Sequence, residues 1–536
     1  MSIKRKIKKV AKKILGEDLK GNHVEFNMDN ASIALKDYIK MYPDALSSYK
    51  KIGRRKDNKD FYPAVKKIED GYDLLYRDLH KYDHNGVTEL IEYYSVRSGT
   101  PMRTKAFPMC KEYVVRMLMS KYLYRYPAIT DKSLGCINVI NYLVREGFQE
   151  EKSEGYDGLG IENIVFTYST THAFNMILQT ICRDEDIVLM TGPNYGLFAV
   201  EPEKLNARVE ILDLSPEDDW YVNPDKLAKK IDELNSMLKE EYKNGNLGYI
   251  PKVVAFLNMN PHNPLGKVMN SKNIDILKGI GDVCLERGVF VLDDLIYRDL
   301  TFDQDDLAVP LASMPKYFNN TISLFGVSKS YGLAGVRAGF IVAPIPIVNG
   351  ICDIIFSNMD SISLLQTQVI AGAFNGSNRR YRLAKRYFKP IIREYKYRLD
   401  LLGCLSEGID TIKSEKQRKR IEKDIKKYTN DEVLRKNLLN GIPGVVLRKD
   451  VYPEAGFFAI LDFTSFKGKK DGNKVIKNDA DFVEYLYKET KIKCIMGLNM
   501  SWPNEEEIIA RISYSLDIKD LIYNFELIGK AIKKLK

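Results

Sequence analysis

Short apolar runs alternate with longer segments of mixed polarity between about residue 160 and residue 345. The runs are rich in β-branched residues and occupy positions 164–167, 187–190, 209–212, 253–257, 289–292, 322–325 and 340–342. Runs that are apolar throughout are typical of strands buried on both faces, and the amphipathic segments between them indicate helical crossovers. The pattern therefore predicts an α/β fold in which helices sandwich a mostly parallel, seven-stranded sheet.

Helical periodicity dominates the chain after about residue 350. Strand-like interruptions occur near residues 456–462 and 511–514, so we expect a smaller α+β domain here. Residues 406–440 are dense in Lys, Arg, Asp and Glu, with apolar residues among them. Mixed charge of this kind is usually a solvated surface, and we interpret the segment as an inserted pair of exposed helices.

The N-terminus has the sharpest local asymmetry of charge. Residues 1–16 place four apolar residues on one helical face and seven cations on the rest. Such a helix is suited to weak contact with an anionic membrane surface, and the alternative is a terminal helix that packs on its own protein or on a partner subunit. The predicted organisation is a helical basic extension over residues 1–90, a large domain over 126–345, and a small domain from 91–125 and 346–536.

Composition narrows the classes of function. The net charge of +10 is spread along the chain, with 82 Lys and Arg set against 72 acids, so we expect no nucleic-acid partner. Seven cysteines are dispersed without a CxxC pair, which predicts reduced thiols in the cytoplasm. Five histidines without an HExxH motif or a His/Cys cluster make a metal site unexpected.

Polar residues gather where the predicted strands end, which is the edge at which open α/β sheets bind ligands. Ser169 and Thr170 follow the first strand and open a helix, where free N–H groups and the helix dipole suit a phosphate. Ordinary N-capping is the alternative for these hydroxyls. Tyr195 follows the second strand in the stretch TGPNYG and offers an aromatic face to a planar ligand.

The later strands end in groups with more specific chemistry. Asn263 lies in the stretch NMNPHNPLG, Asp294 is followed three residues later by Tyr297, and Lys329 precedes Arg337 by eight residues. A buried carboxylate at a strand end is costly unless it meets a cation. A phosphorylated pyridine aldehyde, pyridoxal 5'-phosphate, requires a lysine for its Schiff base, an acid for its ring nitrogen, donors for its phenolate oxygen and a phosphate cradle.

These motifs resemble those of the class I/II aminotransferases, the fold-type I pyridoxal-phosphate-dependent enzymes. NPHNPLG is similar to the family's Asn-Pro-x-Asn-Pro-x-Gly element, which implies that Asn263 binds the phenolate oxygen and lies beside the substrate. DLIY is similar to its Asp-x-x-Tyr element. The resemblance implies that Asp294 pairs with the pyridinium nitrogen and that Tyr297 contacts the phenolate oxygen.

The lysine segment SKSYGLAGVRAGF resembles the Schiff-base segment of the family. The resemblance implies that Lys329 is the catalytic, cofactor-bonded lysine, with Ser328 beside the cofactor and Arg337 on its phosphate. ARISYS resembles the segment whose arginine, here Arg511, clamps the substrate carboxylate through its guanidinium fork. One departure is Gly326, because the family usually has Ser or Thr three residues before the lysine.

The remaining resemblances concern the two ends of the cofactor. YSTTHA is similar to the phosphate turn, which implies cofactor contacts for Ser169 and Thr170, although the family commonly has glycine where Ser169 stands. Tyr195 corresponds to the ring-stacking aromatic. VRSGTP resembles the segment that approaches the substrate through Gly99. Tyr126 is the candidate for the tyrosine that reaches the phosphate from a partner subunit, with Tyr82 as its rival.

The resemblance implies an aminotransferase that moves an amino group from an amino acid to a 2-oxo acid, as a homodimer with its sites at the interface. Two alternatives stay open at this point. The same cofactor chemistry serves decarboxylases and lyases, and the length of the chain is similar to that of the aspartate 4-decarboxylases of this fold. A non-catalytic, ligand-sensing protein of the same fold is the second alternative, with residues 1–90 as its effector module.

Overall fold

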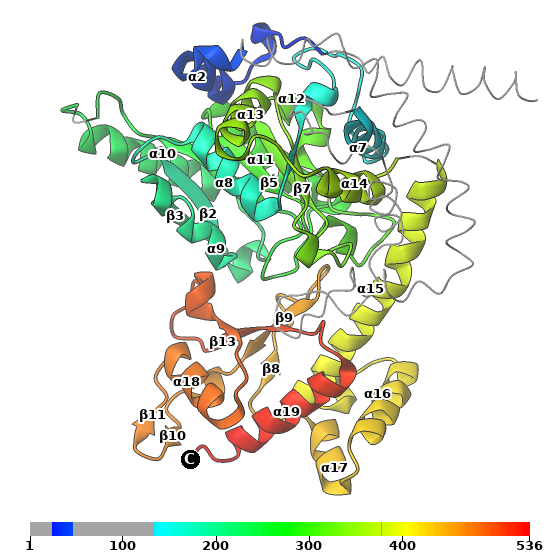
Figure 1. Ribbon diagram of the computed structural model, residues 1–536. Helices are drawn as coiled ribbons and strands as arrows, with labels where there is room; N and C mark the ends of the chain where they lie inside the picture. The colour runs from blue at the N-terminus through cyan, green and yellow to red at the C-terminus, as the bar shows by residue number, and fades with distance from the viewer. Residues whose placement is uncertain (1–23, 47–132, 246, 377) are drawn as a thin grey trace, which may run out of the picture.

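A seven-stranded sheet forms the centre of the computed structural model, which describes residues 24–46, 133–245, 247–376 and 378–536 (Figure 1). The strands lie in the order β1-β7-β6-β5-β4-β2-β3. Their bounds are β1 Ile164–Thr167, β2 Ile187–Gly192, β3 Arg208–Asp213, β4 Val253–Met259, β5 Phe290–Asp294, β6 Thr321–Gly326 and β7 Gly339–Val342. All neighbours are parallel except β7, which is antiparallel to β1 and β6. The predicted fold class is confirmed.

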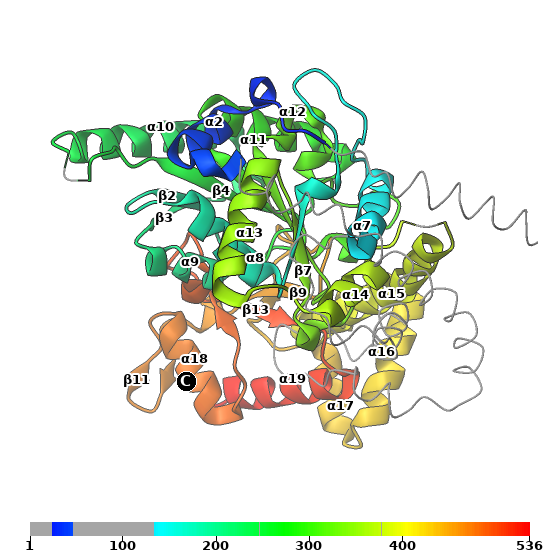
Figure 2. The ribbon, with the colours of Figure 1, turned by 45° about the horizontal axis from the view of Figure 1, so that its top comes forward.

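Helices cover both faces of this sheet (Figures 1 and 2). On one face α8 (Thr170–Ile181) packs against α13 (Ile345–Met359) and against β6 and β7. On the other, α10 (Pro224–Glu241) packs against α11 (Ile274–Glu286), and these helices contact β4 and β5. Two apolar cores result, because successive side chains of each buried strand point to opposite faces.

The C-terminal part is built around a four-stranded antiparallel sheet. Its order is β12-β13-β9-β8, with bounds Ile495–Met496, Ile509–Ser513, Phe458–Asp462 and Val446–Leu447. The helices around it are α15 Asn378–Glu407, α18 Asp479–Thr490 and α19 Ile518–Ile532, and a hairpin β10 Lys470–Asp471 with β11 Lys474–Val475 completes it. This is the smaller α+β unit that the periodicity predicts.

The charged segment 406–440 folds into two helices, α16 (Glu415–Tyr428) and α17 (Glu432–Asn440). They lie against α15 and α19 at the bottom of the molecule in Figure 1. Ile421 and Ile425 are fully buried, whereas most other positions of α16 are exposed or half-buried. The apolar residues of this segment therefore anchor a surface element.

Two helices beyond residue 345 belong to the large sheet. Both α13 and α14 (Leu364–Ala373) place buried side chains in the core shared with β1, β6 and β7. The sequence prediction assigned these residues to the small domain. Packing decides otherwise, because Ile347, Ile351 and Ile370 are fully enclosed in the large core.

The described part of the N-terminal extension packs on the large domain. Helix α2 (Ile33–Met41) contacts α11, and its buried Leu35 and Tyr38 join the large core. The amphipathic pattern of residues 1–16 lies outside the described residues. Within the described ranges, no helix is both long enough and apolar enough to cross a membrane.

Candidate active site

A cavity of about 300 Å³ opens at the carboxyl ends of the parallel strands. It is lined by Ser169, Thr170, Thr171, Tyr195, Leu197, Phe198, Met259, Pro261, Asn263, Asp294, Ile296, Tyr297, Ser328, Lys329, Ala334 and Arg337. The strand ends thus bring together residues separated by more than 160 positions in the sequence. Within the described residues, the predicted cofactor contacts share this one cavity.

Lys329 follows β6 and is half-buried in the cavity wall. Its Nζ lies 5.9 Å from the centre of the Tyr297 ring. Burial, together with the cations Arg511 and Arg337, lowers the pKa of Lys329 to about 8, and Asp294 opposes them. A substantial share of the amine is therefore neutral near physiological pH, which a nucleophilic or basic lysine requires.

Asp294 is the last residue of β5 and is buried beside the cavity. Its Oδ1 accepts a hydrogen bond from the backbone N–H of Ile296 at 3.1 Å. Burial raises the pKa of Asp294 to about 7, the Ile296 N–H opposes this, the neighbouring Asp293 adds to it, and Lys329 opposes it. This carboxyl group can therefore hold or release a proton near neutral pH.

A hydrogen bond joins the two domains at the site. Arg511, from β13 of the small sheet, donates from Nη1 to Oδ1 of Asn263 at 2.8 Å. Both side chains are buried, and burial lowers the pKa of Arg511, which the Tyr297 and Tyr195 hydroxyls oppose. The guanidinium also lies 5.3 Å from the centre of the Phe458 ring. The amide oxygen of Asn263 orients this arginine, and the amide nitrogen of Asn263 can donate to a second partner.

Hydroxyl groups and a helix N-terminus form one end of the cavity. Ser169 is the N-cap of α8, and its Oγ accepts a hydrogen bond from the N–H of His172 at 3.1 Å. Thr170 is the first helical residue and lines the cavity. Arg337 lines it too, with a left-handed backbone (φ 57°) and an exposed side chain whose Nη1 donates to the Ala334 carbonyl at 3.0 Å. This end carries the donors that suit a phosphate.

Close packing explains why residue 326 is a glycine in this fold. A Cβ atom added there would lie 2.8 Å from Ile296 Cδ1 and 3.1 Å from Thr170 Cγ2. The space that a Ser or Thr side chain would take is therefore already filled by two residues of the cavity wall. The absent hydroxyl is accommodated by packing and leaves no hole.

The other predicted residues divide into two groups. Tyr195 and Ser328 line the cavity, and the buried Tyr297 is packed edge-on against Phe457 and Phe458. Gly99, Tyr126 and Tyr82 lie outside the described residues. Their predicted contacts with the substrate and the phosphate stay predictions.

Some residues of this region were not singled out by sequence reasoning. Phe458 packs edge-on against Tyr297, and Thr171, Phe198 and Ile296 line the cavity. Asp293 precedes Asp294 and is fully buried on the other side of the strand. The alternation of side chains along a strand is the signal that separates these two carboxylates.

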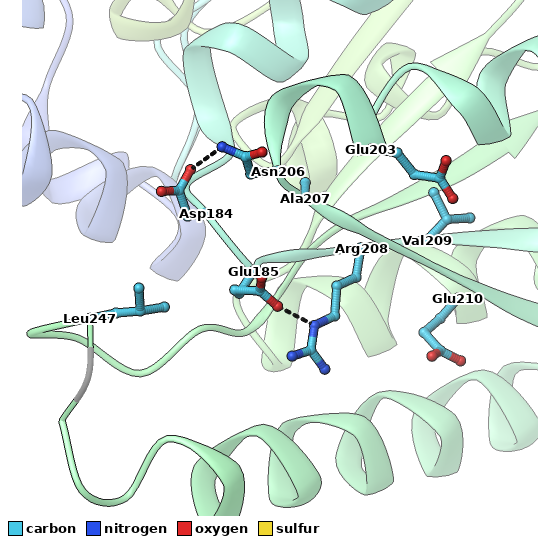
Figure 3. A pocket seen from close by; sticks show the side chains of 9 residues that line it. All are labelled: Asp184, Glu185, Glu203, Asn206, Ala207, Arg208, Val209, Glu210 and Leu247. Carbon is cyan, nitrogen blue, oxygen red and sulfur yellow. Dashed lines mark hydrogen bonds and ion pairs between the residues drawn. The ribbon is translucent and has the colours of Figure 1, made fainter.

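A second hollow, of about 560 Å³, lies at the outer edge of the sheet beside β3 (Figure 3). Two pairs of its polar residues bond to each other: Arg208 donates to Glu185 at 2.5 Å, and Asn206 donates to Asp184 at 3.4 Å. Charged residues on an edge strand protect it from pairing with other chains. This hollow therefore has the features of a protected sheet edge.

Comparison with known proteins gives the same family as the motifs. Residues 150–414 match the family model described as aminotransferase class I and II. A probable aspartate/prephenate aminotransferase of Aquifex aeolicus is 24% identical over 51% of this chain and 56% of its own length. An aspartate aminotransferase of Pyrococcus horikoshii is 20% identical over 72% of this chain and 78% of its own length. A cystathionine beta-lyase of Bacillus subtilis is 29% identical over 34% of this chain and 42% of its own length.

Solved structures share the fold. The aspartate aminotransferase of Rhizobium meliloti superposes with a TM-score of 0.62 at 17% identity, covering 88% of this chain and 96% of that one. The aspartate aminotransferase of Thermus thermophilus with maleate superposes with a TM-score of 0.59 at 14% identity, covering 87% of this chain and 96% of that one. Several curated relatives match this chain over only about half of their own length.

Residues 150–414 carry the match to the class I and II aminotransferase family, and the fold of the chain is that of the fold-type I enzymes. Pyridoxal 5'-phosphate is the cofactor of this class. The residues present fit that group, because the cavity combines a lysine of lowered pKa, a buried acid and a hydroxyl-lined helix N-terminus beside an arginine. The cavity volume suits a small planar ligand.

Proposed function

We propose that this protein is a pyridoxal-phosphate-dependent aminotransferase that moves an amino group from an amino acid to a 2-oxo acid. One observation carries the proposal. Lys329 and Asp294 share a cavity with Asn263, which orients the guanidinium of Arg511. An amine, an acid and a carboxylate-binding cation are the groups that such a reaction needs from the protein.

Each residue has a proposed task. Lys329 holds the cofactor, and after displacement by the amino acid its amine moves the proton at Cα. Arg511 binds the α-carboxylate and so fixes the substrate relative to that amine. When bound, the cofactor withdraws electrons from Cα. Asp294 holds a proton at the ring nitrogen, and Tyr297 and Asn263 donate to the phenolate oxygen.

Other residues hold the remaining parts of the cofactor. Ser169, Thr170 and Arg337, with Ser328 beside Lys329, are proposed to bind the phosphate end. Tyr195 is proposed to stack on the ring. Burial raises the pKa of Tyr297 above its ordinary value, so its hydroxyl keeps its proton and acts as a donor.

The decisive test replaces Lys329 with Ala. We expect the variant to lose amino transfer and the long-wavelength absorption of bound cofactor, since no other lysine lines the cavity among the described residues. Lys267→Ala is a matched control, because Lys267 is buried but pairs with Asp219 at 3.0 Å away from the cavity. Amino transfer at the wild-type rate by the Lys329 variant would refute the proposal.

A lyase or decarboxylase is the second candidate, and the similarity to a cystathionine beta-lyase supports it. The two reactions differ in their products. An aminotransferase yields a new amino acid from an added 2-oxo acid. A lyase releases ammonia and a decarboxylase releases carbon dioxide, and neither needs an added 2-oxo acid. Product analysis with each amino acid as donor separates them.

We further propose a homodimer whose interface lies near the site, working in the cytoplasm. Two exposed apolar side chains beside the cavity, Leu197 and Val200 of α9 (Gly196–Val200), support an interface there. The cysteines of the described ranges are free, which supports a reducing compartment. Light scattering after size exclusion measures the mass, and a monomer at micromolar concentration would contradict the dimer.

A further inference from the structure

The central strand β5 ends with two adjacent carboxylates that face opposite ways. Asp294 lines the cavity, whereas Asp293 has no solvent exposure and does not line it. Two neighbouring acids in one buried strand are costly to fold, because each loses its hydration. Asp293 takes no part in the tasks proposed above, so its burial calls for another reason.

The hydrogen-bond partners of Asp293 suit its charged form. Its Oδ1 accepts from Nδ2 of Asn258, which lies opposite it on β4, at 2.9 Å. Its Oδ2 accepts from the backbone N–H of Leu311, also at 2.9 Å. Each oxygen therefore has one donor, which is the pattern expected for a carboxylate.

The cation that acts on Asp293, Arg298, is already shared with other acids. Arg298 acts electrostatically on Asp293, but its guanidinium bonds Glu146 at 2.6 Å and lies 3.9 Å from Asp299. Among the described residues, Asp293 therefore has donors but no ion pair of its own. Its negative charge acts on its neighbour in the strand.

We propose that Asp293 is a positioning residue for the cofactor: its buried charge, behind Asp294, stabilises the proton that Asp294 and the cofactor's ring nitrogen share. This inference rests on the proposed function, in which Asp294 faces that nitrogen. A second negative charge in a dry part of the protein stabilises a nearby proton, because little water screens it.

The charges around Asp294 agree with this role. Asp293 raises the pKa of Asp294 and Lys329 lowers it, after the larger effects of burial and of the Ile296 N–H. Tyr195 and Tyr297 also feel the Asp294 charge from across the cavity. Burial raises the pKa of Asp293 itself to about 6, against the Leu311 and Asn258 donors and Arg298, so Asp293 is ionised at pH 7.5.

The test measures cofactor binding to the full-length apoprotein at pH 7.5. It compares pyridoxal phosphate with its 1-deaza analogue, in which carbon replaces the ring nitrogen and no proton can be held there. We expect Asp293→Asn to weaken binding of pyridoxal phosphate about tenfold and to leave the analogue nearly unchanged. Equal loss for both ligands, or no loss for either, would overturn the proposal.

A second variant separates charge from hydrogen bonding. The exchange of Asn258→Asp with Asp293→Asn keeps a donor facing an acceptor but moves the charge to β4. We expect its preference for pyridoxal phosphate over the analogue to lie between those of the wild type and the single variant. A preference equal to that of the wild type would show that only the hydrogen-bonded pair matters, and would refute the role of the charge.

Failure of this test and failure of the proposed function are distinguishable. The ratio of the affinities for pyridoxal phosphate and its 1-deaza analogue does not depend on which reaction follows, so a lyase would give the same result. Loss of all cofactor binding in the wild-type protein would instead refute the proposed function. Thermal unfolding of each variant shows whether it is folded at the temperature of the assay.

Discussion

At the scale of single residues, the environment of Lys329 decides its chemistry. An ordinary lysine at pH 7 is neutral in about one molecule in 3,000, whereas one with a pKa of about 8 is neutral in about one in ten. The local cause is burial, helped by two arginines that lie far apart in the sequence. A lysine in the same motif on an exposed loop would lack this reactivity.

The lowered pKa of Lys329 predicts a pH dependence. The neutral amine reacts, so the rate at which the apoprotein takes up pyridoxal phosphate should rise with pH and level off above about pH 8. Arg511→Gln removes a cation that lowers this pKa, so the rise should move to higher pH. Stopped-flow absorbance measures the rates, and a profile identical to that of the wild type would contradict the electrostatic cause.

Gly326 gives a second prediction at this scale. Gly326→Ser introduces a Cβ at 2.8 Å from Ile296 Cδ1, so it should lower the free energy of unfolding by about 1–3 kcal/mol and weaken cofactor binding. Urea titration measures the stability. The double variant with Ile296→Val removes the clashing Cδ1 and should recover most of the loss. No recovery would mean that this contact is not the cause.

At the scale of elements, the N-terminus of α8 combines stability with binding. Ser169 caps the helix and stands at the cavity. Asn478 caps α18, which has the same length of 12 residues, by accepting from the Asp481 N–H at 3.0 Å away from the cavity. The two caps make a matched pair, because each accepts a similar hydrogen bond from its helix but only Ser169 lies at the cavity.

Removal of the Ser169 cap should have two separable effects, one on stability and one on cofactor affinity. Ser169→Ala and Asn478→Ala should each lower the free energy of unfolding by about 1 kcal/mol, because each leaves a helix N–H without its acceptor. Only Ser169→Ala should also weaken cofactor affinity. Isothermal titration with pyridoxal phosphate measures this difference. Equal affinities in the two variants would exclude Ser169 from the phosphate site.

At the scale of the whole molecule, the two domains share a core. The chain has two tryptophans, and they meet across the domain boundary, with ring centres 4.9 Å apart. Trp220 donates to Asp450 at 3.0 Å and Trp502 donates to Glu507 at 2.7 Å. Small-domain residues such as Ile509 lie in the same core as β2 and β4. This contact fixes Arg511 relative to the parallel sheet.

The shared core predicts cooperative unfolding. Urea transitions followed by tryptophan fluorescence and by far-ultraviolet circular dichroism should coincide in the wild type. Trp502→Ala removes the contact, so it should cost about 3–5 kcal/mol and separate the domain transitions. Trp502→Phe keeps an aromatic ring and should remain close to two-state. Separate transitions in the wild type would show that the domains are independent.

The local pattern of apolar runs and motifs in the sequence accounts for most of the predictions that the fold confirms. Each predicted run of the large domain became a strand, because a short apolar run between amphipathic helices can bury its side chains on both faces of a covered sheet. The motifs likewise placed Lys329, Asp294 and Tyr195 at one edge. The boundary at residue 345 failed because helical periodicity does not tell which sheet a helix will cover.

The sequence by itself determined the strands and the residues at the strand ends, since these depend on spacing within a few dozen positions. Only the tertiary structure decided three further points. It brought Arg511 to Asn263 across 248 residues, enclosed Lys329 enough to lower its pKa, and turned Asp293 away from the cavity behind Asp294. Burial and long-range charge act through space, and no local pattern contains them.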